Sequence, residues 1–210
     1  MVKHHALLIG TREGAKWHPL DGIDCELSAI LAGLCELEVT TDRDHLAILE
    51  DGDCDLLICY ADTWEEALPD NQMAEIIRFV AGGGGLLVLH NGICYQKRPE
   101  FQALVGAKFT GHPPAGPLTF RVAESEHPIC DELAEGWTMD EEPYRFQIHS
   151  ATDATVLYEY EHEGVWHPAA WAAGFARGRM VYLMPGHSLD SFRHPTYRGL
   201  IRSAAAWLLA

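Results

Sequence analysis

The chain has 210 residues, of which 48% are hydrophobic and 22% charged, a composition typical of an ordinary globular protein. Its formal net charge of −16 argues against nucleic acid and against anionic membranes as partners, because both would repel it. The apolar runs are far shorter than the roughly 20 residues of a membrane span, and the first five residues do not resemble a signal peptide. We therefore expect a cytoplasmic protein.

The first half of the chain predicts strands that alternate with helices. Segment 71–81 is strongly amphipathic and is followed by glycine, which favours a helix end. The expected elements are strands at 4–10, 36–40, 54–60 and 86–89, and helices at 21–33, 43–49 and 71–81. This alternation indicates βαβ units in an α/β fold with a doubly wound, mainly parallel sheet.

The second half has a different pattern. We expect helices at 99–105 and 195–209, and strands at 118–123, 154–160, 169–175 and 180–184. Arg177 and Gly178 favour a hairpin turn between the last two strands. These strands predict an antiparallel β extension of the parallel core in the C-terminal half. Because no linker, repeat or low-complexity segment interrupts the chain, we expect a single domain over residues 1–210.

The stretch 82–96, GGGGLLVLHNGICYQ, is the centre of the expected fold. Its glycines follow a helix and precede a strand, the reverse of the order in a phosphate-binding loop, so they indicate a helix end and a turn. The short apolar run 86–89 predicts a strand buried on both faces. Ligands bind beyond the carboxyl ends of such strands, which places His90 at the expected site, with Cys94 four residues further on.

Cys94 is the alternative reactive residue in this stretch. The six cysteines show no CxxC pair, so reduced core thiols are the expected state of most of them. The GICYQ segment is similar to the nucleophile elbow of class I glutamine amidotransferases, but the predicted strand ends before His90. Cys94 would then lie inside the following segment and not on the turn.

Three histidines follow predicted strands, and a further histidine in segment 111–114 and a carboxylate in segment 140–144 join them as candidates. The set comprises His18, His90, His112, His187 and Glu142. Their convergence over one sheet edge would suit general acid–base chemistry or a divalent metal such as zinc. No HxxxH spacing decides between these two, so no cofactor is assigned and the metal is left open.

Five stretches carry a resemblance to a known family: GGGLLVLH at 83–90, GHPP at 111–114, HPI at 127–129, DEEPY at 140–144 and GRMVYLMPGH at 178–187. With the closing helix, they resemble the ThuA-like (trehalose utilisation) family, a branch of the class I glutamine amidotransferase-like superfamily. The resemblance implies a flavodoxin-like core, loss of the amidotransferase cysteine and a role in sugar metabolism. It places the superfamily's catalytic histidine at His187, with Asp190 three residues later.

The favoured hypothesis is therefore a carbohydrate-processing enzyme that acts by His/Glu acid–base chemistry on a disaccharide or an oxidised (3-keto) disaccharide. His90, His187, Glu142 and His112 are the candidate catalytic residues. The candidate substrate-binding residues are Trp17, His18, Trp64, Asn91, Tyr95 and Asp190. A non-catalytic sugar-binding protein and a Cys94-dependent amidase are the alternatives. We expect a small-molecule carbohydrate as the ligand, and the chain can form a homo-oligomer.

Overall fold

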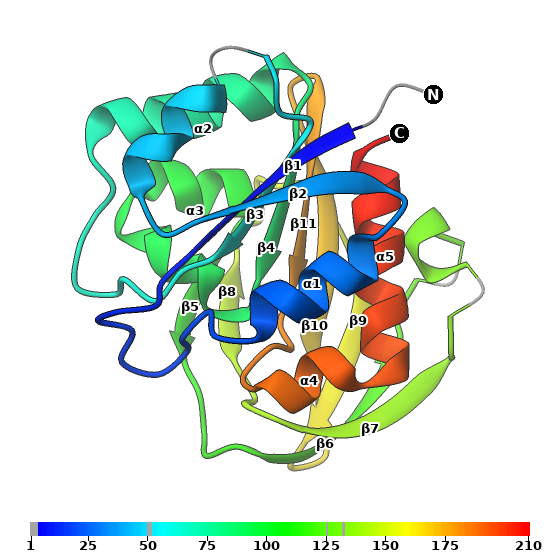
Figure 1. The fold of residues 1–210 in the computed structure, drawn as a ribbon. Coiled ribbons are helices and arrows are strands. Elements are labelled where there is room, and N and C mark those ends of the chain that lie inside the picture. Colours follow the sequence, from blue (N-terminus) through cyan, green and yellow to red (C-terminus); the bar gives the residue numbers. More distant parts are fainter. Residues whose placement is uncertain (1–3, 50–51, 125, 132) are drawn as a thin grey trace.

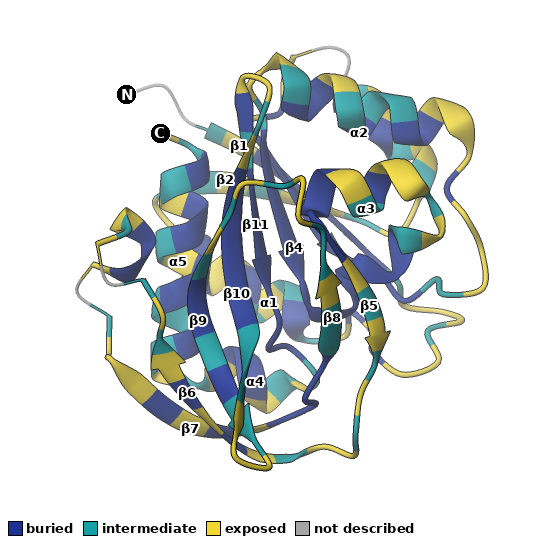
Figure 2. Ribbon diagram, turned by 180° about the vertical axis from the view of Figure 1, so that it is seen from behind, coloured by how far each residue is buried: buried dark blue, intermediate teal, exposed yellow. Residues whose placement is uncertain are grey.

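A computed structural model describes residues 4–49, 52–124, 126–131 and 133–210. A nine-stranded sheet runs through these residues in the order β2-β1-β3-β4-β11-β10-β9-β6-β7, with helices on both faces (Figure 1). A separate two-stranded sheet, β5-β8, lies beside α3 (Figure 2). The fold is α/β and doubly wound, as the sequence predicts.

The first five strands of the sheet order are parallel and form the flavodoxin-like core. They are β2 (Cys35–Thr40), β1 (His4–Gly10), β3 (Leu56–Tyr60), β4 (Gly85–Leu89) and β11 (Gly178–Leu183). Every residue of β3 and β4 is buried, because helices cover both faces of these central strands. The carboxyl ends of β1, β3, β4 and β11 therefore meet at one edge of the sheet.

Helices cover the two faces of this parallel core. One face carries α1 (Ile23–Leu31), α4 (Leu189–Arg193) and α5 (Pro195–Leu208), and the other carries α2 (Asp70–Gly82) and α3 (Pro99–Val105) (Figures 1 and 2). At the end of α2, Gly83 has a φ of 122°, and its N–H donates to the carbonyls of Phe79 and Val80. The glycine run thus ends a helix, as expected, because only glycine adopts this backbone without strain.

The antiparallel extension lies beyond β11 in the sheet order and begins with β10. β10 (Val165–Phe175), β9 (Ala154–His162), β6 (Gly116–Val122) and β7 (Gly136–Glu141) follow β11 in the sheet, each antiparallel to its neighbour. The sequence placed the strand at 180–184 in this extension. The structure corrects this placement: β11 is antiparallel to β10 but parallel to β4, so it completes the parallel core.

Some elements lie outside the sequence prediction. β5 (Ala107–Gly111), β7, β8 (Arg145–Ile148), α4 and the 3-10 helices η2 (His90–Lys97) and η3 (Pro128–Cys130) were not expected. The unexpected elements are short or half exposed, so their hydrophobic periodicity is weak. The helix expected at 43–49 is present as the 3-10 helix η1 (Arg43–Leu49). Among the described residues, no helix combines the length and the apolar character needed to cross a membrane.

Candidate functional site: a histidine and glutamate cluster under an aromatic pocket

His90 stands immediately after the central strand β4, where the chain turns sharply into η2. Its φ of 42° lies in the left-handed region, which is unfavourable for a side chain with a Cβ. Strain of about 1–3 kcal/mol at such a residue persists only where the surrounding structure enforces it, and it is common at functional sites. His90 therefore occupies the strained strand end where the sequence predicted the chemistry.

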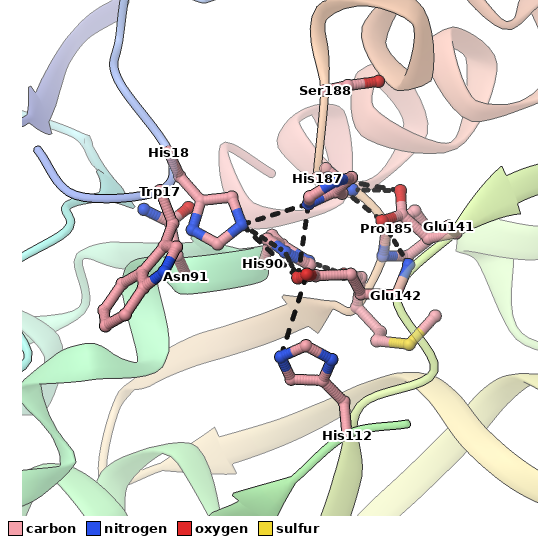
Figure 3. Close-up of polar contacts among 12 residues, drawn as sticks. Trp17, His18, His90, Asn91, His112, Glu141, Glu142, Pro185, His187 and Ser188 are labelled. Carbon is pink, nitrogen blue, oxygen red and sulfur yellow. Dashed lines mark hydrogen bonds and ion pairs between the residues drawn. The ribbon is translucent and has the colours of Figure 1, made fainter. Parts of the chain in front are cut away.

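Three further side chains converge on His90 from remote parts of the chain. The cluster consists of His18, His90, Glu142 and His187, and one nitrogen or oxygen atom from each lies within 4.8 Å of the other three (Figure 3). Nε2 of His90 is 3.2 Å from Nε2 of His18 and 3.2 Å from Oε2 of Glu142. Nδ1 of His187 is 3.2 Å from the same His18 nitrogen and 3.3 Å from the same Glu142 oxygen. We call these four residues the His/Glu cluster.

The His18 loop follows β1 and is held by Asp62, which follows β3. One carboxylate oxygen of Asp62 accepts from the backbone N–H of Trp17 at 2.7 Å and from that of His18 at 3.0 Å. Both Asp62 and His18 are buried. The sequence analysis did not select Asp62, although its position after a buried strand was a usable signal.

The His187 loop follows β11 and is held by Glu141, which is fully buried. The Glu141 carboxylate accepts from the backbone N–H of Gly186 at 2.7 Å, from that of His187 at 3.1 Å and from the Ser191 hydroxyl at 2.8 Å. The sequence analysis chose Glu142 and overlooked Glu141. The alternation along β7 could have identified it, because Glu141 falls on the same inward face as Trp137 and Met139.

Gly186 allows this loop to pass close to His90. Its φ is 141°, and a Cβ built on it would lie 2.8 Å from the Cβ of His90. Any side chain at position 186 would push the His187 loop away from β4. The glycine in the PGH segment therefore permits the close approach of the two strand ends that carry His90 and His187.

The cluster shifts the pKa values of its members. Burial tends to raise the pKa of Glu142, but hydrogen bonds from His18, His187 and His90 outweigh it and hold that pKa well below its usual range. Burial lowers the pKa of His18, whereas the hydrogen bond to Glu142 raises the pKa of His187. The carboxylate is thus ionised in a largely buried environment.

A pocket of about 490 Å³ opens above the cluster. Aromatic side chains form much of its wall, and His18 and Glu142 lie at the boundary between the pocket and the cluster. The lining residues are Trp17, His18, Trp64, Phe109, Gly111, His112, Glu142 and Tyr144. Trp17 is 51% exposed, unusual for a residue of its size, while Trp64 packs against Phe109 with ring centroids 5.2 Å apart.

His112 approaches Glu142 from the pocket side. Its Nε2 is 3.7 Å from Oε1 of Glu142, the carboxylate oxygen that does not enter the cluster, and its side chain is partly exposed (Figure 3). Tyr144 lies between two histidines, stacked on His90 at 4.2 Å and on His112 at 5.2 Å between centroids. Glu142 therefore links the buried cluster to a histidine that faces the pocket. Phe109 could not be selected from the sequence, because the chain order gives no sign that β5 reaches this site.

Several of the predicted site residues do not line the pocket. His90 is fully buried and lies behind Glu142 and His18, so it does not itself line the pocket. Tyr95 is fully buried and packs edge to face on Phe101, which leaves no surface for a ligand. Asn91 is also buried and donates to the carbonyl of Ala61. Asp190 is 91% exposed and pairs with Arg193 at 3.6 Å, away from the pocket.

Cys94 does not have the environment of a nucleophile. It lies within η2, is fully buried, and contacts the Thr63 hydroxyl at 3.5 Å. Burial raises the pKa of the Cys94 thiol to about 11, whereas reactive cysteines have lowered pKa values. The structure therefore counts against the Cys94-dependent amidase.

We predict that iodoacetamide at neutral pH will modify Cys94 far more slowly than Cys25 in the folded protein. Cys25 is exposed and provides a control within the same chain. Peptide mass spectrometry after timed quenching measures both rates. Labelling of Cys94 before Cys25 would show that a reactive thiol stands at the strand end after all.

The parallel strand order and the strained turn after β4 are consistent with the class I glutamine amidotransferase-like fold. A family model described as ThuA, trehalose utilisation, matches residues 13–208. The chain belongs to this family. A comparison with curated proteins finds no match.

Solved structures show the same fold. A ThuA-like protein from Parabacteroides merdae is 16% identical, with a TM-score of 0.83, covering 99% of this chain and 90% of the other. A ThuA-like protein from Bacteroides uniformis is 18% identical, with a TM-score of 0.77, covering 98% and 91%. A β-galactosidase from Rahnella sp. R3 is 13% identical, with a TM-score of 0.69, and the match covers 96% of this chain but 31% of the enzyme.

Proposed function

We propose that this ThuA-family protein is a carbohydrate-processing enzyme that acts on a disaccharide, preferably an oxidised (keto) disaccharide, at the His/Glu cluster. The observation that carries the proposal is an aromatic pocket with ionisable groups at its base. Its volume of about 490 Å³ falls within the range of about 300–1,000 Å³ that is usual for small-molecule sites. The net charge of −16 also favours a small neutral ligand over nucleic acid.

The pocket walls suit a pyranose ring. Trp17 and Trp64 present flat apolar faces, against which the C–H faces of a sugar can pack while its hydroxyls remain free for hydrogen bonds. His18, His112 and Glu142 supply polar groups on the same surface. A pocket with apolar walls and a few fixed polar groups is the usual form of a site that binds and orients one small ligand.

Acid–base chemistry next to a sugar carbonyl needs a base and a group that stabilises the developing oxyanion. His112 faces the pocket and contacts Oε1 of Glu142, so we assign proton transfer to the His112–Glu142 pair. The remaining cluster side chains lie behind Oε2 of Glu142, where they can stabilise negative charge. In this assignment His112 moves the proton, and the His/Glu cluster holds the negative charge.

The test is incubation of the purified chain with a panel of disaccharides and their 3-keto derivatives, with mass spectrometry as the readout. We expect a mass or fragmentation change in at least one keto disaccharide and a slower or absent change in its parent sugar. Binding of a sugar without any chemical change over hours would instead indicate a non-catalytic sugar-binding protein. The proposal would be contradicted if the chain neither bound nor converted any sugar of the panel.

We also predict that Trp17→Ala will weaken disaccharide binding about 2–10-fold, the effect of losing one stacking contact of about 0.5–1.5 kcal/mol. Trp17 is exposed, so its replacement should leave the folded structure intact. Trp166→Ala is the matched control, because Trp166 packs against Arg121 and does not line the pocket. Isothermal titration calorimetry gives both affinities, and equal losses in the two variants would disprove the assignment of the pocket.

A further inference from the structure

We propose that His18, His90, His187 and Glu142 bind one divalent transition-metal ion of the zinc type. The inference rests on the proposed function only in that it concerns the same site. It assigns an ion to the His/Glu cluster, and it can be tested without a sugar substrate.

The spacing of the four atoms is that of a metal coordination shell. Ligands about 2.0–2.1 Å from a tetrahedral zinc ion lie about 3.3–3.4 Å from one another. Five of the six separations within the cluster are 3.2, 3.2, 3.2, 3.3 and 3.4 Å, and the sixth is no longer than 4.8 Å. Five of the six separations thus match those between the ligands of one zinc ion.

Protons alone cannot satisfy these contacts. A carboxylate oxygen can only accept a hydrogen bond, so the nitrogens of His18, His90 and His187 that face Oε2 of Glu142 would all need to carry hydrogen. The His18 nitrogen would then point its hydrogen at two other N–H groups, each 3.2 Å away. Removing a proton from any of the three nitrogens instead leaves its lone pair facing the carboxylate. A cation at the centre removes the conflict, because all four atoms then present lone pairs to it.

The surroundings prepare His90 for this role. Its Nδ1 lies 2.6 Å from the carbonyl of Met184, which can only accept, so Nδ1 carries the hydrogen. In the neutral ring Nε2 is then left with a free lone pair aimed into the cluster. A metal-bound histidine commonly donates its second N–H to a backbone carbonyl or a carboxylate in this way.

Charge balance supports the same conclusion. Glu141 and Glu142 are both buried, and within the described part of the chain neither pairs with a lysine or an arginine. Unpaired buried carboxylates are costly. A doubly charged cation bound by Glu142 would offset the negative charge of that carboxylate. Three imidazoles and one carboxylate favour zinc or a similar transition metal over magnesium or calcium, which prefer oxygen ligands throughout.

A metal here would also be reachable from the pocket. His18 and Glu142 line the pocket and belong to the cluster, so a sugar oxygen that enters beside them would approach the ion. A zinc-type ion polarises a bound carbonyl or hydroxyl oxygen and stabilises negative charge on it. This is the role that the proposed function requires behind Glu142.

The experiment uses untagged protein, because an affinity tag of histidines would itself bind metal. The metal content is measured by inductively coupled plasma mass spectrometry, before and after removal of metal by a chelator and reconstitution with Zn²⁺. We expect about one equivalent per chain after reconstitution. In a parallel sample loaded with Co²⁺, the intense visible absorption of a four- or five-coordinate ion should appear.

Two ligand variants and one neighbour make the test specific. His187→Ala and His90→Ala should weaken Zn²⁺ binding at least about 100-fold, because the loss of an outer-sphere partner alone costs about 10–100-fold. His187 is only half-buried, so its variant should fold even if the His90 variant does not. His112→Ala is the matched control: His112 contacts Glu142 but not the four ligand atoms, and its variant should keep one equivalent.

Failure to bind Zn²⁺ or Co²⁺ after reconstitution would overturn the inference, as would equally tight binding in His187→Ala and the unaltered protein. These outcomes are separate from those of the sugar assay. Full conversion of a keto disaccharide by metal-free protein would show that the reaction needs no metal, and it would leave the proposed function in place. Binding of one equivalent of metal without conversion of any sugar would support the metal site and contradict the proposed enzymatic function.

Discussion

Glu142→Gln should reduce the conversion of the keto disaccharide by about 10²–10⁴-fold, the usual contribution of one positioned acid–base group. Glu142 is the residue on which the site depends most, because its Oε2 contacts His18, His90 and His187 and its Oε1 faces His112. Glutamine keeps the size of the side chain but removes its charge. The variant should therefore fold and bind sugar while losing turnover.

Two controls accompany this measurement of initial rates by mass spectrometry. Asp140→Asn removes a carboxylate two positions away that lies on the exposed side of β7, and it should leave the rate within about twofold. Cys94→Ser should cost less than about tenfold, because Cys94 is buried away from the pocket. An unaffected rate in Glu142→Gln together with a lost rate in Cys94→Ser would restore the amidase hypothesis.

The second large effect concerns stability. Glu141→Ala should lower the free energy of unfolding by about 3–5 kcal/mol, because it leaves the buried N–H groups of Gly186 and His187 and the Ser191 hydroxyl without their acceptor. Urea denaturation followed by circular dichroism measures the loss. Conversion of the sugar should fall as well, since the His187 loop loses the group that holds it.

Glu163→Ala is the control for this variant. Glu163 is 85% exposed, and its replacement should change the free energy of unfolding by less than about 0.5 kcal/mol. Glu141→Gln should lie between the two, because the amide keeps one acceptor oxygen. If Glu141→Ala were as stable as the Glu163 variant, the buried carboxylate would not be what holds the loop after β11.

The parallel core could be predicted from the sequence because its signals are local. Strands such as β4 are short apolar runs with turn residues at both ends, and helices such as α2 have a clear apolar face and a glycine at the end. β11 was placed in the wrong part of the sheet because pairing direction depends on a remote partner. Its parallel neighbour β4 lies about 90 residues earlier in the chain, and no local pattern records that contact.

The site was predicted in part for the same reason. His18, His90 and His187 follow strands whose carboxyl ends must meet at one edge, so their convergence was accessible from topology. Tyr95 and Asn91 were misplaced because η2 turns inward, and the sequence shows apolar and polar residues there without a clear period. Tyr144 was missed because its role depends on how the segment after β7 packs against His90. Glu141 was missed although the alternation along β7 could have identified it.

The proposed function requires that a sugar binds in the aromatic pocket with its reacting oxygen beside the His/Glu cluster. A crystal structure of Glu142→Gln soaked with the keto disaccharide that the protein converts tests this most directly. We expect the pyranose ring against Trp17 and the sugar carbonyl oxygen next to His18 and position 142, within reach of His112. A sugar bound elsewhere on the molecule, with this pocket holding only solvent, would contradict the proposed sugar site.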